Sequence, residues 1–472
     1  MPKTYYIETY GCQMNVADSE VVASVLGEAG YEPVKDIKKA DLILVNTCSI
    51  RENAEQRVWG RLDLFRSEKK KRPQVIVGVL GCMAERLKEK LLESNKMVDM
   101  VIGPDAYRDL PILVDTAVSG HAAVNVLLSR EETYADISPV RFESNGVSAF
   151  ISIMRGCNNM CAYCVVPYVR GTERSRDPET IVREAREVFE KGYREVTLLG
   201  QNVNSYSWAS IDTLNPLPSF PGKGIPTNLQ ISRDEKVLPN KNQTVDFATL
   251  LGMVASIDPG LRIRFSTSHP KDLSDDVLKV MAKYDNICKH IHLPVQSGSS
   301  TVLERMNRKY SREWYLGRIA AINRILPGCT LSTDIIAGFC GETEEEHQET
   351  LSLMQEAGFD FAYMFKYSER PDTKAARQLK DDVPDQVKTR RLNEIIALQN
   401  ELSAKSKKAD IGETFEVLVE GKAKRSSGAL MGRTTGNKVV VFQAVGIKPG
   451  DYVNVTITRS TSATLIGDIV TP

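Results

Sequence analysis

Short apolar runs alternate with longer amphipathic stretches in the first part of the chain. The runs at 4–11, 41–47 and 74–81 are rich in Ile, Leu, Val and Tyr and are bounded by polar residues, which is typical of buried strands. Helix-like stretches accompany them at 18–29, 51–70 and 83–95, and a further strand and helix fit 101–118. Because strands and helices alternate, the pattern predicts an α/β domain with a parallel sheet over residues 1–140.

A polar connector at 131–146 precedes a second and larger alternation. Its strand-like runs lie at 148–155, 195–201, 261–268, 290–296, 330–338 and 360–367. Its helix-like runs lie at 178–191, 246–257, 274–283, 311–325 and 343–357. We expect a partial (β/α)6 barrel over 147–385, because a closed barrel of this type needs eight such units.

Two other segments complete the organisation of the chain. An insertion at 204–245 is rich in Pro, Gly, Asn and Ser and has no period, and it leaves from the end of the second barrel strand. A surface insertion is the favoured interpretation, and a lid or an RNA contact is the alternative. A linker helix at 386–408 leads to residues 409–472, where short alternating strands and glycine turns predict a small antiparallel β-barrel.

Composition excludes some classes of protein. The chain has 472 residues with 61 basic and 61 acidic side chains, so any RNA contact must come from local basic patches. No apolar run is long enough to cross a membrane, and the chain does not start with the apolar core of a signal peptide. We therefore expect a cytoplasmic protein whose nine cysteines are metal ligands or buried thiols rather than disulfides.

Three cysteines form the most specific motif of the chain. Cys157, Cys161 and Cys164, called the loop trio below, have the spacing C-x3-C-x2-C. Three thiolates can bind three irons of a 4Fe-4S cube and leave the fourth iron open for another ligand. A structural zinc site needs four closed ligands, and no fourth Cys or His lies nearby. Three unrelated buried thiols are the alternative interpretation.

A second set of cysteines follows the strands of the first domain. Cys12, Cys48 and Cys82, called the sheet trio below, each come directly after a strand-like run. The carboxyl ends of parallel strands share one sheet edge, so we expect these thiols to converge there. They predict a second cluster with an open iron. Zinc with an outside fourth ligand is the competing metal, and small buried residues are the alternative without a metal.

Polar residues end several barrel strands and predict a cofactor site at that edge of the barrel. Gln201, Ser266, Gln296 and Asp334 are the candidates, because small and amide side chains suit a flat, polar cofactor. Each of them could also be a capping or turn residue.

Basic side chains gather in two places that could contact phosphates. Lys422, Lys424, Arg425 and Arg433 belong to the last segment, where a small β-barrel favours RNA binding over a solvated turn. Arg170, Arg174 and Arg176 follow the loop trio and could bind phosphate or carboxylate groups, or form surface ion pairs.

Taken together, the chain resembles the radical S-adenosylmethionine (SAM) methylthiotransferases over nearly its whole length. The matching stretches are Tyr10-Gly11-Cys12-Gln13-Met14-Asn15, Asn46-Thr47-Cys48-Ser49-Ile50-Arg51-Glu52-Asn53-Ala54 and Cys161-Ala162-Tyr163-Cys164-Val165-Val166-Pro167-Tyr168-Val169-Arg170-Gly171. These are similar to the MiaB group, which methylthiolates carbon 2 of N6-isopentenyladenosine at position 37 of tRNA. The sister groups typically have Gly-Cys-Pro-Lys-Asn or Gly-Cys-Lys-Val-Asn at the first cysteine.

The resemblance implies an N-terminal methylthiotransferase domain, a radical-SAM barrel and a C-terminal TRAM barrel that binds RNA. It implies two 4Fe-4S clusters, with SAM at the loop trio as radical source and a second SAM as methyl donor for sulfur on the sheet trio. Tyr163 is then expected near the SAM adenine, and the TRAM barrel and the basic linker helix are expected to hold the anticodon stem-loop. An electron donor of flavodoxin or ferredoxin type, a sulfur or cluster donor and a monomeric state are further expectations.

Other functions stay open at this point. The same chemistry could act on threonylcarbamoyl-adenosine tRNA or on a ribosomal-protein aspartate, and a non-enzymatic iron–sulfur module that binds RNA is a different class. The chain departs from the family at Cys340, where proline is usual, and at the 204–245 insertion. We interpret Cys340 as a neutral replacement and Cys288 and Cys329 as core residues.

Overall fold

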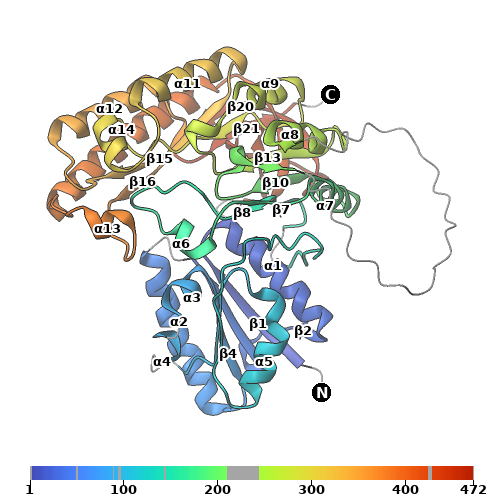
Figure 1. Cartoon of the computed structure of the whole chain (residues 1–472). Coiled ribbons are helices and arrows are strands. Elements are labelled where there is room, and N and C mark those ends of the chain that lie inside the picture. The colour runs from blue at the N-terminus through green and yellow to red at the C-terminus, as the bar shows by residue number, and fades with distance from the viewer. Residues whose placement is uncertain are drawn as a thin grey trace, which may run out of the picture.

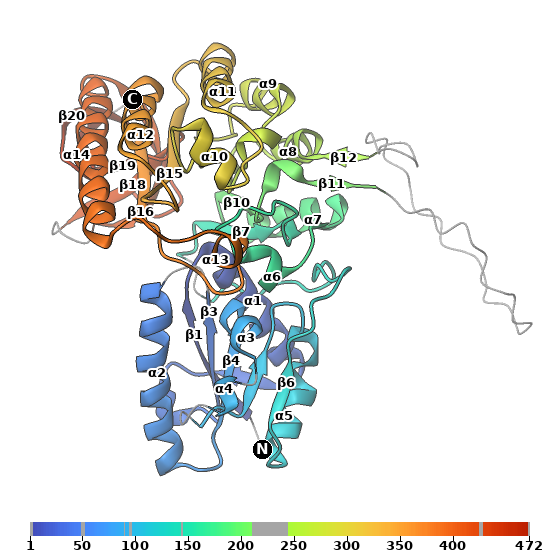
Figure 2. The same cartoon turned by 60° about the vertical axis from the view of Figure 1, so that its left-hand side comes forward.

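The computed structural model describes residues 3–48, 52–88, 90–93, 97–142, 145–209, 244–423 and 428–470. The N-terminal domain forms a lower lobe, and the barrel and the C-terminal strands form an upper lobe (Figure 1). Helix α6 (Val166–Arg170) of the upper lobe lies at the junction, close to α3 (Cys82–Leu87) of the lower lobe (Figures 1 and 2). In the described part of the chain, no helix is long and apolar enough to span a bilayer.

The lower lobe is a parallel sheet between two layers of helices. Its six strands lie in the order β2-β1-β3-β4-β5-β6. Their bounds are Lys3–Tyr10 (β1), Tyr31–Pro33 (β2), Leu42–Thr47 (β3), Ile76–Gly81 (β4), Met100–Ile102 (β5) and Ala123–Asn125 (β6). The helices are Gln13–Glu28 (α1), Glu52–Lys71 (α2), Cys82–Leu87 (α3), Lys90–Glu93 (α4) and Leu110–Val118 (α5). Side chains of β3 and β4 point alternately to the two faces of the sheet. One face packs under α1 and α5 and the other under α2 and α3, so both strands are fully buried.

The upper lobe contains six parallel strands in two groups. Strands β7 (Ser148–Ser152), β10 (Glu195–Leu199) and β13 (Arg262–Ser266) form one sheet, and β14 (His290–His292), β15 (Thr330–Ala337) and β16 (Phe361–Lys366) form the other. A parallel bridge between Ile263 and Ile287 joins the two groups. Around them lie α7 (Pro178–Glu190), α8 (Phe247–Ala255), α9 (Asp275–Lys283), α10 (Ser300–Arg305), α11 (Arg312–Ile325), α12 (Glu344–Ala357) and α13 (Lys374–Gln378). The largest hydrophobic core fills the space between these strands and helices.

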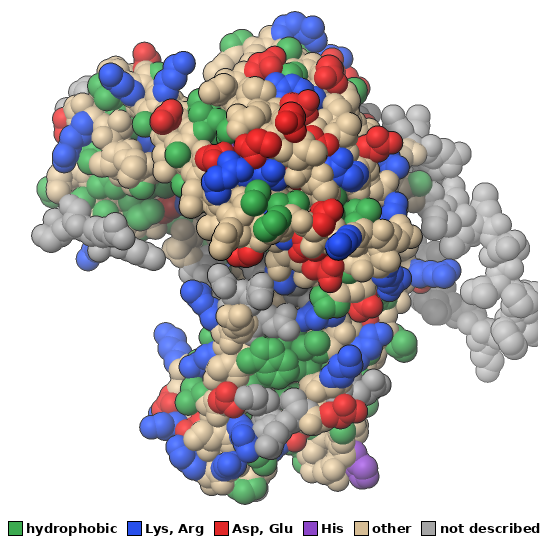
Figure 3. Space-filling view, turned by 90° about the vertical axis from the view of Figure 1, so that its left-hand side faces the viewer, with side chains coloured by type: hydrophobic (Ala, Val, Ile, Leu, Met, Phe, Trp, Pro, Cys, Tyr) green, Lys and Arg blue, Asp and Glu red, His purple; other side chains and the backbone are tan. Residues whose placement is uncertain are grey.

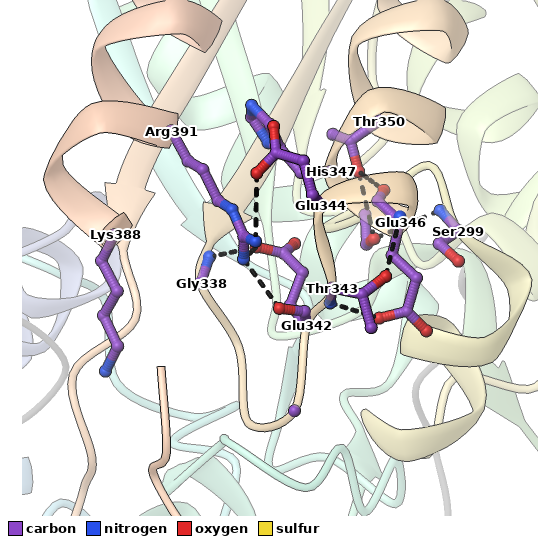
Figure 4. A network of polar contacts seen from close by, with 12 residues as sticks. Ser299, Gly338, Glu342, Thr343, Glu344, Glu346, His347, Thr350, Lys388 and Arg391 are labelled. Carbon is purple, nitrogen blue, oxygen red and sulfur yellow. Dashed lines mark hydrogen bonds and ion pairs between the residues drawn. The ribbon is translucent and has the colours of Figure 1, made fainter. Parts of the chain in front are cut away.

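The loop after β15 is tied to two helices by a polar network (Figure 4). Glu342 accepts a hydrogen bond from the Gly338 amide at 2.7 Å and binds the Arg391 guanidinium at 3.0 Å. The Thr343 hydroxyl caps α12 by accepting from the Glu346 amide. In turn, the Glu346 carboxylate accepts a hydrogen bond from the Thr343 amide at 2.9 Å. This capping box and the buried ion pair hold the end of β15 in place.

The long C-terminal helix is part of the barrel, not a free linker. Helix α14 (Asp385–Ala409) packs on β15, β16 and α12. Its Lys388 and Arg391 are buried, and Arg390 pairs with Glu344 and Glu394. Lys388 and Arg391 therefore do not reach RNA, because they pair with acidic groups inside the barrel, Asp381 and Glu342. The expectation that this helix holds RNA through its exposed basic side chains stays a prediction.

Five strands after α14 close a small barrel. They are β17 (Thr414–Lys422), β18 (Ala429–Thr434), β19 (Val439–Gln443), β20 (Tyr452–Ser460) and β21 (Leu465–Ile469), in the order β17-β18-β19-β21-β20. One pair departs from the expected antiparallel pattern, because β19 and β21 run parallel. This barrel covers the end of the larger one where β13 begins, since Arg262 binds Glu416 at 2.8 Å and Arg264 donates to the Thr434 carbonyl at 2.8 Å.

The expected fold class is confirmed, and two details were missed. Strands β2 and β6 extend the N-terminal sheet at both edges. The polar connector is packed against both lobes, because Tyr134 is buried against Tyr107 and Arg141 binds Glu20 of the lower lobe and Glu184 of the upper lobe.

Most of the 204–245 insertion lies outside the described residues, and its base is a strand pair, Ser207–Trp208 (β11) with Val245–Asp246 (β12). The domain boundaries stay a prediction.

Candidate functional site

The sheet trio converges at one edge of the N-terminal sheet. The Cys12 and Cys48 thiols are in hydrogen-bond contact, and Arg170 donates from Nε to Cys82 Sγ at 3.2 Å while also lying near Cys12. Gly11 makes this approach possible: its φ is +136°, and a Cβ there would lie 2.5 Å from Cys48 Cβ. The convergence inferred from strand positions is thus present in the structure.

The electrostatic setting of the sheet trio suits thiolate ligands. The hydrogen bond with Cys48 and the charge of Arg170 lower the pKa of Cys12 to about 6. Burial raises the pKa of Cys82, and the Arg170 guanidinium opposes this rise. A thiolate set with a cation beside it fits an iron–sulfur cluster, which is bound by deprotonated sulfur.

The loop trio lies at the end of β7, in the loop between the short strands β8 (Met154–Arg155) and β9 (Arg174–Ser175). Gly156 has φ +76°, and a Cβ there would meet the Thr172 carbonyl oxygen at 1.9 Å, so only glycine lets the loop turn this closely. The Asn159 amide donates to Cys157 Sγ and Arg308 donates to Cys161 Sγ, both at 3.4 Å. Burial raises the pKa of Cys157 to about 11 and that of Cys164 to about 12, with the neighbouring Cys161 adding to the latter.

The segment that follows the loop trio contacts the sheet trio at the junction of the lobes. Cys82 packs against Val165 and Val169, which follow Cys164 in the chain. Asp18 of α1 accepts hydrogen bonds from Arg155 at 2.8 Å and from Arg170 at 2.7 Å, and all three side chains are buried. Arg155 comes just before the loop trio and Arg170 just after it, so this carboxylate anchors both ends of the loop to the first domain.

Several buried polar atoms just beyond the carboxyl ends of β10 and β13 have no partner among the described residues. They are Gln201 Oε1, both side-chain polar atoms of Asn204, and His269 Nδ1. Burial and the nearby Arg308 lower the pKa of His269 to about 2, so its ring is neutral at physiological pH. Unpaired buried polar atoms are rare in folded proteins, and here they fit a polar cofactor at this barrel edge.

Of the four candidates for cofactor contact, Gln201 is one of these unpaired groups. Gln296 is buried with φ +75°, and the adjoining strand end also has a non-glycine residue at positive φ, Thr267 at +73°. Such strained positions cluster at functional sites. Ser266 is partly buried, and Asp334 faces His292 at 3.5 Å. Their contact with a cofactor stays a prediction, as does that of Tyr163, which packs edge-on against Phe339.

Three arginines expected at a phosphate site are instead buried in internal ion pairs. Arg170 binds Asp18 at 2.7 Å, Arg174 binds Asp105 at 2.9 Å, and Arg176 binds Glu184. All are buried, so the expectation that they reach RNA is wrong. Phosphate binding, carboxylate binding and surface ion pairs were the alternatives for them, and carboxylate binding is the one observed, inside the protein and not at its surface.

The basic positions of the C-terminal barrel are only partly visible. Lys422 is exposed, whereas Arg433 binds Glu420 at 2.9 Å and is partly buried. Lys424 and Arg425 lie outside the described residues. Positive and negative side chains are interspersed over the face of the molecule in Figure 3, as expected for a chain without net charge.

An aromatic stripe on β16 was missed in the sequence. Phe361, Tyr363 and Phe365 are 48%, 47% and 39% exposed, although they lie on a barrel strand. Ala362, between them, belongs to the hydrophobic core, so the three rings face the opposite side, where Tyr363 contacts the His292 ring at 5.8 Å. In the sequence, the signal is that aromatic residues occupy every second position from 361 to 365. From the sequence, this run was interpreted only as a strand.

The three remaining cysteines lie in hydrophobic surroundings. Cys288 and Cys329 are buried, which agrees with the expectation of core residues. Cys340 is also buried and packs in a cluster with Ala162, Phe339 and Tyr367, beside the loop trio. Burial raises the pKa of Cys340, which suits a packed neutral thiol.

Three family models match successive parts of the chain. Residues 4–103 match the model described as Uncharacterized protein family UPF0004, residues 151–354 match the Radical SAM superfamily, and residues 408–470 match the TRAM domain. The matches cover most of the N-terminal sheet, most of the six-stranded barrel and the C-terminal barrel.

Two curated relatives from different bacteria carry the same name. A tRNA-2-methylthio-N(6)-dimethylallyladenosine synthase from Amoebophilus asiaticus is 57% identical over 470 residues, which is 99% of this chain and 93% of the relative. The protein of the same name from Bacteroides thetaiotaomicron is 56% identical over 468 residues, covering 99% and 96%. Among solved structures, the radical S-adenosylmethionine methyltransferase TsrM from Kitasatospora setae has a TM-score of 0.54 at 13% identity, covering 77% of this chain and 72% of that chain. This last likeness concerns the fold alone.

Proposed function

The chain belongs to the tRNA-2-methylthio-N(6)-dimethylallyladenosine synthase family, and from this premise we propose that it replaces the carbon-2 hydrogen of N6-isopentenyladenosine at position 37 of tRNA with a methylthio group. It is a radical-SAM sulfur-group transferase with two 4Fe-4S clusters and SAM as cofactors. That hydrogen sits on a strong, non-acidic bond, which acid–base side chains cannot activate, so cofactors must bring the chemistry.

One observation carries the assignment of the clusters to residues. The loop trio and the sheet trio come from different domains, yet Cys82 packs against Val165 and Val169, directly after the loop trio. We assign the SAM-binding cluster to the loop trio and the auxiliary cluster to the sheet trio. When bound, these groups supply the radical that removes the hydrogen and the methylthio group that takes its place.

The protein's own residues bind, orient and exclude water. Asp18 and its two arginines keep the trios at a fixed separation, which a transfer between two cofactors requires. Gln201, Asn204 and the neutral ring of His269 offer polar atoms to SAM. Closure of the site by both lobes keeps water from a reactive radical.

The RNA is held on surfaces that present exposed aromatic rings and positive charge. The stripe of Phe361, Tyr363 and Phe365 offers faces on which unpaired bases stack, and the exposed Lys422 lies on the C-terminal barrel. The substrate region is the anticodon stem-loop, whose target base must leave its stack to reach the cofactors. A flavodoxin or ferredoxin donates electrons, a separate donor restores sulfur, and the chain acts as a monomer.

An anaerobic reaction of the reconstituted protein with dithionite, SAM and tRNA carrying isopentenyladenosine tests the proposal. Mass spectrometry of the digested tRNA should show the 2-methylthio nucleoside, and 5′-deoxyadenosine should form. The matched substrate, tRNA carrying threonylcarbamoyl-adenosine, should stay unmodified. Absence of 5′-deoxyadenosine would favour a non-enzymatic iron–sulfur module, and modification of the second tRNA would assign the chain to the sister group.

A further inference from the structure

The side chain of Arg170 lies between Cys82 of the sheet trio and Asp18 of α1. Its Nε donates to Cys82 Sγ at 3.2 Å and its Nη2 donates to Asp18 Oδ2 at 2.7 Å. The third nitrogen, Nη1, is buried and has no hydrogen-bond partner among the residues that the structure describes. The side chain is only 4% exposed, so bulk water does not satisfy this donor.

A buried guanidinium nitrogen without an acceptor is costly, because its desolvation is not repaid by a hydrogen bond. The two acceptors that Arg170 contacts are already engaged: Asp18 also accepts from Arg155 and from the Tyr107 hydroxyl, and Cys82 receives Nε. Arg174 provides a contrast in the same region, since its Nη1 donates to the Ser129 carbonyl at 2.6 Å and its Nη2 binds Asp105. Arg170 Nη1 is therefore free to donate to an acceptor that the described residues do not provide.

We propose that Arg170 is the hydrogen-bond donor of the auxiliary cluster, with Nε on the Cys82 sulfur and Nη1 on an inorganic sulfide. This inference rests on the proposed function, in which the sheet trio holds a 4Fe-4S cluster. Arg170 is a positioning residue in this role. Hydrogen bonds to cluster sulfurs reduce the negative charge that the irons experience and thereby raise the reduction potential. The arginine also couples the cluster to the loop trio, because it follows that loop directly in the chain.

A redox titration followed by electron paramagnetic resonance (EPR) tests this role without relying on activity. The parent is the full-length chain with the loop trio changed to alanine, so that one cluster gives the signal. Arg170→Lys keeps the positive charge next to Asp18 and removes the guanidinium donors. We expect its cluster to have a lower midpoint potential than the parent. Arg174→Lys, a change in a buried pair that contacts no described cysteine, should leave the potential where the parent has it.

A second measurement needs no change at Arg170. Pulsed EPR of the reduced parent labelled with guanidino-15N arginine should show a 15N coupling to the cluster, and Arg170→Lys should lose it if its cluster assembles. An unchanged potential in Arg170→Lys, or a labelled parent without 15N coupling, would overturn the role of Arg170 and leave the proposed function intact. A parent that takes up no iron would overturn the assignment of the sheet trio, and this inference with it.

Discussion

Replacing Asp18 by asparagine removes one of the buried charges that join the two lobes. Its two carboxylate oxygens bind Arg155 at 2.8 Å and Arg170 at 2.7 Å, and the three side chains are 1%, 2% and 4% exposed. Asparagine has nearly the same size, so the change leaves no cavity. It leaves two buried guanidinium groups facing a neutral amide, and loss of one partner of a buried ion pair costs about 3–5 kcal/mol. We expect about 3 kcal/mol, because the amide oxygen still accepts one hydrogen bond.

The cost should appear as a loss of docking between the lobes. Urea unfolding of the cluster-free protein should show an earlier first transition, and hydrogen exchange should increase in α1 and α6. Asp276→Asn is the control, because Asp276 pairs with Lys279 on an exposed helix surface and should leave the first transition unchanged. An Asp18→Asn protein within about 1 kcal/mol of the parent, with unchanged exchange in both helices, would refute the interlobe role.

The same carboxylate gives the effect a pH dependence. Burial alone would raise the pKa of Asp18, but Arg155 and Arg170 together hold it below its ordinary value. A lowered folded-state pKa means that this stability is present above the unfolded-state value, near 3.9, and is lost as the pH falls through the folded value. The difference between the parent and Asp18→Asn should therefore be full at pH 7 and shrink in acid.

Three further predictions address the site, the RNA surface and a buried acid. Any single Cys→Ala change in the loop trio should abolish 5′-deoxyadenosine formation, whereas a change in the sheet trio should spare it and stop methylthio transfer; methylthio product from a sheet-trio variant would contradict this. Tyr363→Ala should weaken tRNA binding by about 1–3 kcal/mol in a filter-binding assay, and Tyr363→Phe should not; equal affinity for all three proteins would exclude stacking. Burial raises the pKa of Glu85 to about 7 and its Oε2 has no described partner, so stability should fall between the unfolded-state pKa, near 4.3, and about 7. At pH 8 the Glu85→Gln protein should therefore be more stable than the parent by on the order of 2 kcal/mol and should unfold at a higher urea concentration. At pH 4 the two proteins should unfold at the same urea concentration; a lower midpoint for Glu85→Gln at pH 8 would contradict this.

The sequence was most informative where a strand position decides a side chain's location. Cys12, Cys48 and Cys82 were expected together because parallel strands end at one edge, and the structure brings them there. The same reasoning placed Gln201 and Gln296 at the barrel edge. The position where a strand ends and the side-chain periodicity along it are local properties, so they can be read without knowing how the domains pack.

The ion pairs that form in the folded chain could not be read in this way. Arg170, Arg174 and Arg176 resemble an exposed basic cluster in the sequence. In the structure, Arg170 and Arg174 bind carboxylates of the first domain, and Arg176 binds Glu184 of α7. Lys388 and Arg391 belong to the linker helix that was expected to hold RNA, and they are buried against the barrel. A local pattern identifies a charge but not its partner, because the partner is set by tertiary packing.

Counting iron and sulfide per chain after anaerobic reconstitution tests most directly whether the two trios hold two clusters. The unchanged protein should bind about eight irons and eight sulfides, and the variant with the sheet trio changed to alanine about four of each. About four irons in the unchanged protein, or the same count in both proteins, would contradict the account.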